Sequence, residues 1–313
     1  MKRVWPAWLL LGLGAFFLTL AAIAQFWATG AAERIPLDSY QRTYLTGPGD
    51  VLDPATGKTS HEQIKITNIT QVDDQVSTGS VVVFVTATCV NHDIGDPADC
   101  LTKADPRMIS VSKLNYASDR HTAMAIDDPR YVTNDPPVQG LTNKWPFYPK
   151  NISYPVWDDT SKQATPAQYT GDVTVQGLKC KQYHQVITGA QIDLGNQIMA
   201  DYSLDEVYTI DAVTGKIINQ QLHDKRTLVD GGATALDLTV QYTPDTIKDN
   251  VDYAKSSGKQ LELVTKTLPV VGLVVGLVCL AIGIPLLVRA MRSNRRTRDA
   301  ADEPTDATTS AGV

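Results

Sequence analysis

Two long stretches of this sequence contain no charged residue, one running from residue 4 to 32 and the other from 267 to 288. A bilayer core about 30 Å thick requires roughly 20 apolar residues in a helix, so both stretches are long enough to cross it. Because a backbone in lipid must satisfy its own hydrogen bonds, each stretch should be helical. The sequence therefore predicts transmembrane helices at residues 5–28 and 267–288, one near each end of the chain.

A cleaved signal peptide is the alternative explanation for the first stretch. Residues 9–23 have the length of an apolar signal core, and residues 28–32 are rich in small side chains. The uncharged run is longer than a signal requires, and Trp5, Trp8 and Trp27 lie near its ends, as aromatic residues do at membrane interfaces. These features favour an uncleaved anchor.

Basic residues beside the two apolar stretches indicate the orientation of the chain. Lys2 and Arg3 precede the first stretch. Five arginines follow the second: Arg289, Arg292, Arg295, Arg296 and Arg298. Since short segments rich in Lys and Arg remain in the cytoplasm, residues 1–4 and 289–313 are expected inside the plasma membrane and residues 29–266 outside it.

The sequence lacks the motifs of the common catalytic and metal sites. It contains no HExxH, CxxC, GxSxG or phosphate-binding GxxxxGK[ST] pattern, and its five histidines show no metal-ligand spacing. The carboxylate pair Asp158-Asp159 lies beside turn prolines, where acidic pairs are usually plain surface. We therefore expect neither an enzyme nor a metal or cofactor site.

Acidic residues dominate the segment between the two anchors. Of the 28 Lys and Arg residues, seven lie in the flanks of the anchors; of the 34 Asp and Glu residues, four lie in the tail 299–313. Residues 29–266 therefore carry a net charge near −9. Such a charge disfavours nucleic acid and anionic lipid head groups as partners. The tail has no aromatic residue and is expected to be disordered.

Cysteines are few, and three of the four lie between the anchors. Cys89 and Cys100 are eleven residues apart, and an oxidising exterior would allow them to form a disulfide. Cys180 is then left as a buried free thiol, with a swapped pairing as the alternative. Cys279 lies in the second apolar stretch, where it serves as a small apolar side chain.

The hydrophobic pattern between the anchors has the period of β-strands. Strand patterns occupy residues 64–67, 80–90, 108–116, 173–187 and 236–242, and a hairpin pattern occupies residues 200–229. The slip at Gly177 predicts a bulge within one strand, whereas residues 33–60 predict an extended, turn-rich segment. We expect a mainly β (α+β) fold with six to nine antiparallel strands, in a curved sheet or a sandwich. A helix should begin after Thr243, with Pro244 at its first position.

Residues 127–170 combine seven prolines with large aromatic side chains, a composition that excludes regular helix and central strand. Five aromatics fall within thirteen residues: Trp145, Phe147, Tyr148, Tyr154 and Trp157. They form either a long loop that seals one end of the sheet or the mouth of a hollow for an apolar ligand. The sequence does not decide between these two interpretations.

Gly272 and Gly276 form a GxxxG pair in the second apolar stretch. Small residues at this spacing let two membrane helices approach closely. The pair therefore indicates contact with the first anchor or with a partner's helix, although glycine is also common in membrane helices for other reasons.

The aromatic–proline segment resembles a known family. Lys144-Trp145-Pro146-Phe147, Tyr154-Pro155-Val156-Trp157-Asp158 and Val175-Gln176-Gly177-Leu178 are similar to motifs of the actinobacterial DUF3068 family, also called the porin PorA family. Its usual Lys-Phe-Pro-Phe has Trp145 in place of the first Phe here. The resemblance covers most of residues 5–290 and includes the arrangement of two anchors.

The resemblance implies a role in the cell envelope. Some members of the family look like mycobacterial polar growth factor A, which is linked to export of mycolic lipids beside a resistance–nodulation–division (RND) lipid transporter. The implied partners are membrane lipids and an RND-type transporter or another envelope-biogenesis membrane protein, with no nucleic acid. The family name implies the alternative, a pore-forming subunit. Two apolar helices around a polar domain do not form a water channel by themselves, which favours lipid handling or scaffolding.

Overall fold

The computed structural model describes residues 5–53 and 56–299 of the 313-residue chain. Lys2 and Arg3, and the acidic tail from residue 300 onward that is predicted to be disordered, lie outside the described residues. The side chains of the arginines between residues 294 and 299 lie outside them as well. The chain divides into two compact units, one made of its two ends and one spanning Glu33–Lys259.

The unit made of the two chain ends is helical. Its elements are α1 (Trp5–Ile23), the π-helical turn η1 (Ala24–Ala28), α2 (Thr29–Ala32), the π-helical turn η2 (Leu263–Thr267) and α4 (Leu268–Asp299). The two ends of the chain thus supply two helices that are long and apolar enough to span a membrane. Gly272 and Gly276 of α4 face α1, because a Cβ on these glycines would lie 3.1 Å from Ala21 and 2.7 Å from Leu18. The GxxxG pair therefore packs within the chain.

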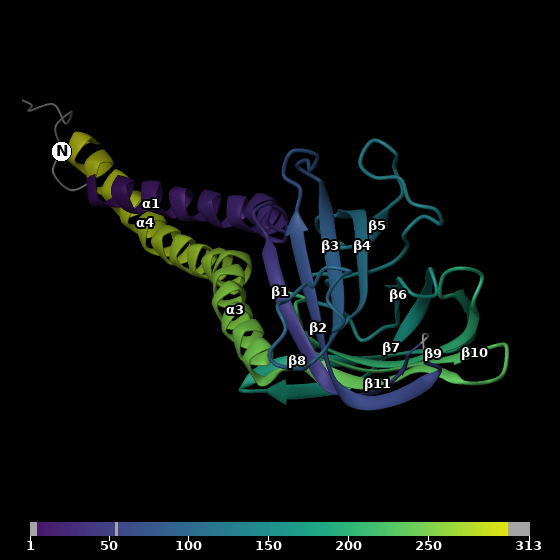
Figure 1. Ribbon diagram of the computed structural model, residues 1–313. Coiled ribbons are helices and arrows are strands. Elements are labelled where there is room, and N and C mark those ends of the chain that lie inside the picture. Colours follow the sequence, from purple (N-terminus) through teal and green to yellow (C-terminus); the bar gives the residue numbers. More distant parts are fainter. Residues whose placement is uncertain (1–4, 54–55, 300–313) are drawn as a thin grey trace, which may run out of the picture. The chain divides into compact units, whose positions relative to one another are not determined.

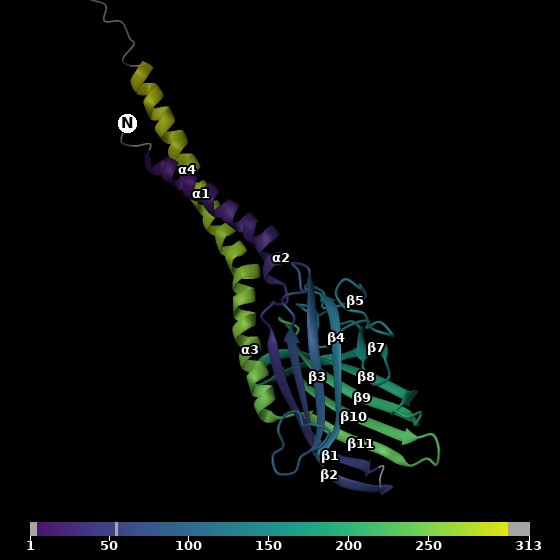
Figure 2. The same ribbon diagram turned by 45° about the horizontal axis from the view of Figure 1, so that its top comes forward.

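The unit spanning Glu33–Lys259 is built on one antiparallel sheet, which contains eleven strands among the described residues (Figures 1 and 2). The strands are β1 (Tyr40–Asp53), β2 (Lys58–Val72), β3 (Val81–His92), β4 (Met108–Asp119), β5 (Ala125–Ile126), β6 (Tyr154–Asp158), β7 (Gln163–Val175), β8 (Leu178–Asp193), β9 (Met199–Asp211), β10 (Ile217–Leu228) and β11 (Thr234–Tyr242). Their order is β5-β4-β3-β2-β1-β11-β10-β9-β8-β7-β6. Hairpins connect most neighbours, and the first strand pairs with the last in the middle of the sheet. The sheet curls into a half-barrel whose edge strands are β5 and β6 (Figures 1 and 2).

The mainly β antiparallel fold is confirmed as a curved sheet, but the expected six to nine strands were too few. One reason is the segment 173–187, which is two strands and not one strand with a bulge. Gln176 and Gly177 have φ of 47° and 79°, and Val175 pairs with Leu178. Two consecutive positive φ values are what a tight two-residue hairpin turn requires.

A second correction concerns residues 33–60, which contain the long strand β1 where we expected a turn-rich segment. Gly47 and Pro48 pair with β2 on one side but interrupt the pairing with β11 on the other. A Cβ on Gly47 would lie 2.1 Å from the carbonyl oxygen of Thr239, so a residue without a side chain allows β11 to approach. Gly and Pro here serve strand packing and do not end the strand.

The aromatic–proline segment also contains more strand than predicted. Residues 154–158 form β6, and β7 begins at Gln163. Pro155 and Pro166 are paired with each other, at the edge of the sheet and just before the β7–β8 pairing begins. Proline is tolerated at such positions because no ladder hydrogen bond is lost. The prolines therefore did not exclude strand, only central strand.

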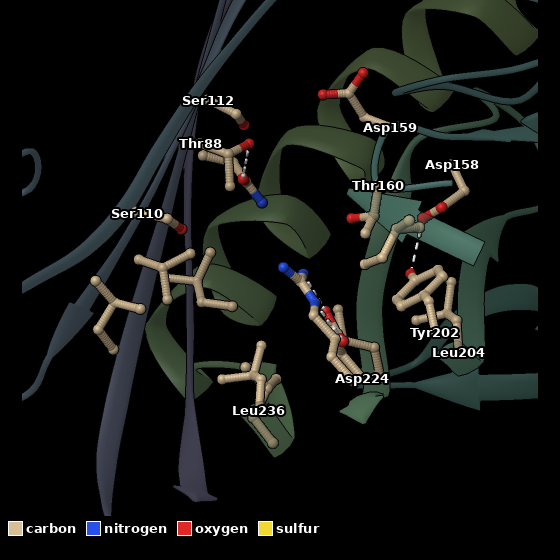
Figure 3. A pocket seen from close by; sticks show the side chains of 18 of the residues that line it. Thr88, Ser110, Ser112, Asp158, Asp159, Thr160, Tyr202, Leu204, Asp224 and Leu236 are labelled. Atoms are coloured by element: carbon tan, nitrogen blue, oxygen red, sulfur yellow. Dashed lines mark hydrogen bonds and ion pairs between the residues drawn. The ribbon is translucent and has the colours of Figure 1, made fainter. Parts of the chain in front are cut away.

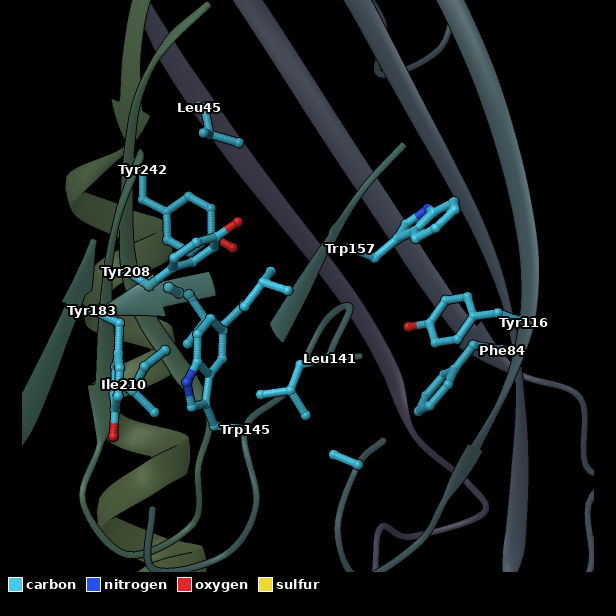
Figure 4. Packing of buried hydrophobic residues seen from close by; sticks show 14 of the residues in the cluster. Leu45, Phe84, Tyr116, Leu141, Trp145, Trp157, Tyr183, Tyr208, Ile210 and Tyr242 are labelled. Carbon is cyan, nitrogen blue, oxygen red and sulfur yellow. The ribbon is translucent and has the colours of Figure 1, made fainter. Parts of the chain in front are cut away.

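The main core lies on the concave side of the sheet (Figure 4). Its largest fully buried side chains come from strands on both sides of the curl and from the loop before β6: Leu45, Ile64, Tyr116, Leu141, Trp145, Tyr183 and Ile210. A second cluster joins the sheet to α3 (Pro244–Glu262), whose Val251 and Ala254 pack against Cys180 and Ile218. As predicted, α3 begins at Pro244; the Thr243 hydroxyl accepts a hydrogen bond from the N–H of Thr246.

Candidate functional site: the hollow of the curled sheet

The curl of the sheet encloses a hollow of about 1070 Å³. Ligand pockets commonly measure about 300–1,000 Å³, so this one has room for a large organic molecule. Aliphatic side chains from both arms of the sheet form much of its lining: Leu45, Val51, Ile66, Val90, Leu114, Leu204, Leu222, Leu228, Leu236 and Leu238. Polar side chains form two separate groups on opposite walls (Figure 3).

The first polar group lies on β1–β4 and is uncharged. Its side chains are hydroxyls and amides at every second position of neighbouring strands: Gln41, Thr43, Asn68, Thr70, Thr86, Thr88, Ser110 and Ser112. The register places Thr88 between Asn68 and Ser112. Since alternate residues of a strand share a face, the pairing of β2, β3 and β4 produces a continuous polar surface. The Thr88 hydroxyl donates a hydrogen bond to Asn68 Oδ1 at 2.9 Å. Part of the hydrogen-bonding capacity of this wall is therefore used within the wall.

The second polar group is ionic, and β9 and β10 carry most of it; we call Asp158, Tyr202, Glu206, Asp224 and Arg226 the ionic cluster. Arg226 donates two hydrogen bonds to the Asp224 carboxylate, from Nε to Oδ1 at 3.0 Å and from Nη2 to Oδ2 at 2.6 Å. Tyr202 donates its hydroxyl proton to Asp158 Oδ2 at 3.0 Å, which ties the end of β6 to β9. Tyr202 and Glu206 share the inward face because they are four residues apart on one strand.

Burial changes the ionisation of the cluster. Glu206 is 5% exposed, and the loss of water raises the pKa of its carboxyl to about 7. Hydrogen bonds donated by Tyr208 and Gln220 oppose this rise without cancelling it. Burial also raises the pKa of Asp158, against hydrogen bonds from Ser161 and Tyr202. Both carboxyls therefore lie in surroundings that disfavour their charged forms.

Of the five aromatic residues that the sequence offers as a possible mouth of a hollow, only Trp157 lines it. Trp145 is fully buried against Tyr208 and Tyr183, with ring centroids 4.8 and 5.6 Å away. Phe147 lies under the ammonium of Lys144, whose Nζ is 3.8 Å from the ring centroid. The structure therefore separates residues that the sequence placed in one group.

The remaining two aromatics belong to the same packed region as Trp145. Tyr148 donates its backbone N–H to the carbonyl of Val213, and Trp145 donates its own to Gly215, each at 2.9 Å. Tyr154 packs edge-on against Tyr183 at 5.7 Å. These contacts dock the segment onto the β9–β10 turn, so most of it acts as a packed loop that closes the sheet.

Sequence reasoning missed the ionic cluster. The sequence predicts a surface position for Asp158, but in the structure Asp158 lines the hollow and accepts a hydrogen bond from Tyr202. A signal was present in β9, where Tyr202, Leu204, Glu206 and Tyr208 occupy alternate positions and so place a carboxylate on an otherwise apolar inward face. A carboxylate on a buried strand face is uncommon unless it is paired with another polar group.

The structure pairs Cys89 with Cys100, with Cα atoms 5.3 Å apart, and leaves Cys180 as a buried free thiol. The disulfide holds the β3–β4 loop, and Asn91 strengthens this attachment by donating to the carbonyls of Ala98 and Asp99 at 3.2 Å. Among the residues described, no group of His, Cys, Asp and Glu side chains could hold a metal ion.

In a comparison with known families, the family model described as "Porin PorA" matches residues 6–285. The match covers nearly all of α1, all the strands of the sheet and the first part of α4. A comparison with curated proteins finds no match.

Proposed function

This chain belongs to the Porin PorA family, and on the basis of its hollow we propose that it binds a membrane lipid, as a protein that handles or scaffolds envelope lipids. The lipids expected from the family resemblance are of the mycolate type. The site is the concave side of the sheet, and the proposed location of the sheet is the outer face of the plasma membrane, with both termini in the cytoplasm.

The observation that carries this proposal is the size and lining of the hollow. A volume of about 1070 Å³ with an aliphatic band and two polar walls suits an amphiphile better than a small polar solute. The aliphatic side chains offer a surface for hydrocarbon, and the polar walls offer hydrogen bonds to a head group. Burial of apolar ligand surface supplies roughly 25 cal/mol per Å², so even partial enclosure of one acyl chain would be favourable.

The second candidate function is a pore-forming subunit, which the family name favours. The helical unit argues against it. In the candidate span Trp5–Ala32, the polar residues other than tryptophan are Thr19, whose hydroxyl donates to the carbonyl of Ala15, and Gln25 and Thr29 near its end. The outward residues of α4 that are about half exposed are aliphatic, such as Val274 and Leu277. A water-filled path needs polar or charged groups along it, and neither span supplies a stripe of them.

The proposed partners follow from the same function. Membrane lipids are the ligands, and an RND-type lipid transporter or another envelope-biogenesis membrane protein is the expected neighbour. The orientation can be tested separately with a reporter fused after Val313. Activity of a reporter that works only in the cytoplasm is expected, and activity only outside the membrane would contradict the orientation.

Native mass spectrometry of the full chain, released from an uncharged detergent, tests the lipid proposal. We expect a bound lipid that survives removal of the detergent. Leu222→Trp should lower its occupancy, because the larger ring fills the hollow from β10. Val186→Trp is the matched control, since Val186 is 49% exposed and does not line the hollow. Equal occupancy in the two variants would place the lipid elsewhere and refute the proposal.

A further inference from the structure

The charges inside the hollow are strongly unequal. Among the described residues that line it, the acidic side chains outnumber the basic ones: Asp158, Asp159, Asp193, Glu206 and Asp224 against Lys162 and Arg226. A cavity surrounded by low-dielectric protein strengthens the effect of each uncompensated charge. The identity of a bound head group should therefore depend on which of these charges are already paired.

Both basic side chains already have a carboxylate partner. Arg226 binds Asp224 through two nitrogens, and its guanidinium also lies 5.7 Å from the ring centroid of Tyr202. Lys162 Nζ is 2.6 Å from Asp159 Oδ1. Each basic group is thus neutralised by a neighbour in its own wall, and no described lining residue offers a free cation to a ligand.

The other three carboxylates have only uncharged hydrogen-bond donors. Asp158 accepts from the backbone N–H and hydroxyl of Ser161, both at 2.6 Å, and from the hydroxyl of Tyr202. Glu206 accepts from the Tyr208 hydroxyl at 2.7 Å and from the amide of Gln220. In their ionised forms these carboxylates therefore leave an uncompensated negative charge in the hollow.

Asp193 completes this set near the β8–β9 turn. Its Oδ1 accepts the backbone N–H of Gly195 at 2.7 Å, and no described cation lies against it. Asp193 is exposed, so solvent screens its charge, and the negative potential of the hollow comes mainly from the buried Asp158 and Glu206.

From this pairing we infer that the hollow selects lipids whose head group has no net negative charge and excludes anionic phospholipids. The inference rests on the proposed function, because it states which lipids the same hollow takes. An anionic phosphate placed in the hollow would face carboxylates without a cation to bind. An uncharged head group can instead donate hydrogen bonds to Asp158 and to the hydroxyl wall of β1–β4. The raised pKa of Glu206 agrees with a site that lacks a counter-cation.

A matched pair of lipids tests the inference. The full chain in an uncharged maltoside detergent is mixed with equal amounts of dioleoylglycerol and dioleoyl phosphatidylglycerol, and native mass spectrometry measures the occupancy of each. The acyl chains are identical, so the ratio reports the head group alone. We expect about a tenfold or greater preference for dioleoylglycerol in the unaltered chain.

A double variant connects the preference to the named residues. Asp158→Asn with Glu206→Gln keeps the shape of both side chains and should narrow the preference severalfold. Asp205→Asn with Asp252→Asn is the control: it also replaces two carboxyl groups by amides, at exposed positions that pair with His184 and Lys248. The control should leave the ratio unchanged.

Each outcome has a distinct meaning. Equal or stronger binding of dioleoyl phosphatidylglycerol by the unaltered chain would overturn the charge selection while leaving lipid binding intact. Narrowing of the ratio by the control as much as by the hollow variant would also overturn it, because the effect would then come from net charge. Binding of neither lipid would overturn the proposed function together with this inference.

Discussion

The packing around Trp145 and the hollow beside Trp157 belong to the same curled sheet, yet space is filled in one and left open in the other. At Trp145, the inward positions of neighbouring strands carry tyrosines, and their rings meet the indole at 4.8 and 5.6 Å. In the hollow, many inward positions carry aliphatic, hydroxyl or amide side chains, and the larger Tyr202 and Arg226 bind the carboxylates of Asp158 and Asp224 in their own wall. Aromatic rings that pack against each other therefore mark the filled part of the concave face, and the open part lacks such packing.

The largest effect should come from removing the ring at the packed end. Trp145→Ala should lower the free energy of unfolding by about 3–5 kcal/mol, the usual cost of truncating a fully buried tryptophan. Chemical denaturation of the full chain measures the change. Lipid occupancy per folded molecule should stay the same, since Trp145 does not line the hollow. A loss of occupancy with unchanged stability would break the distinction between the two regions.

The next effect concerns the pH dependence of the ionic cluster. Glu206 has a folded-state pKa raised to about 7 from an ordinary value of 4.5, so the folded chain holds its proton more tightly than the unfolded chain. Its contribution to stability is present below pH 4.5 and is lost as the pH rises to about 7, a change of about 2–4 kcal/mol. Denaturation midpoints between pH 4.5 and 8 should therefore contain a falling component.

Glu206→Gln should remove this component and leave the variant the more stable protein at pH 8. The Gln side chain keeps an oxygen that can accept from Tyr208, so the packing is preserved. Asp205→Asn, on the exposed side of the same strand, is the control and should leave the slope unchanged. An identical slope in the chain with and without Glu206 would contradict the assignment of the raised pKa.

The sequence predicts the strands and helices of this chain, but not the hollow or the ionic cluster on the concave side of its sheet. The alternation in β2, β3, β9 and β11 predicted strands correctly, because a half-buried strand requires that period. The apolar runs predicted the helical ends for an equally local reason. The hollow could not be predicted, since it depends on which inward side chains of distant strands face each other after the sheet curls. Trp145 and Trp157 look alike in sequence, and only the fold separates them.

A smaller effect should appear where the packed loop meets the β9–β10 turn. Gly215 has φ of 72°, and a Cβ there would lie 2.3 Å from the carbonyl oxygens of Trp145 and Pro146. Gly177 has φ of 79° with no atom within 4 Å of its Cβ position. Each Gly→Ala change costs about 1–2 kcal/mol for the left-handed backbone. Gly215→Ala should cost more than Gly177→Ala in thermal unfolding, and equal costs would show that the loop is not docked there.

The smallest effect on stability should come from the tryptophan of the hollow. Trp157 is 7% exposed and packs in the main core as well as lining the hollow, so Trp157→Phe, which keeps one aromatic ring, should cost about 1–2 kcal/mol. Lipid occupancy should fall by more than the stability change alone would cause. If the variant instead loses several kcal/mol with normal occupancy per folded molecule, Trp157 serves only as core, like Trp145.

The most direct test of the central claim is to find where a bound lipid touches the chain. A diacylglycerol with a photoreactive diazirine in one acyl chain is added to the full chain, irradiated, and the labelled peptides are identified by mass spectrometry. We predict adducts in β9–β11, including the peptide that contains Leu222, and their loss in Leu222→Trp but not in Val186→Trp. Adducts confined to α1 and α4 in all three proteins would show that the lipid only surrounds the spans, and would contradict lipid binding in the hollow.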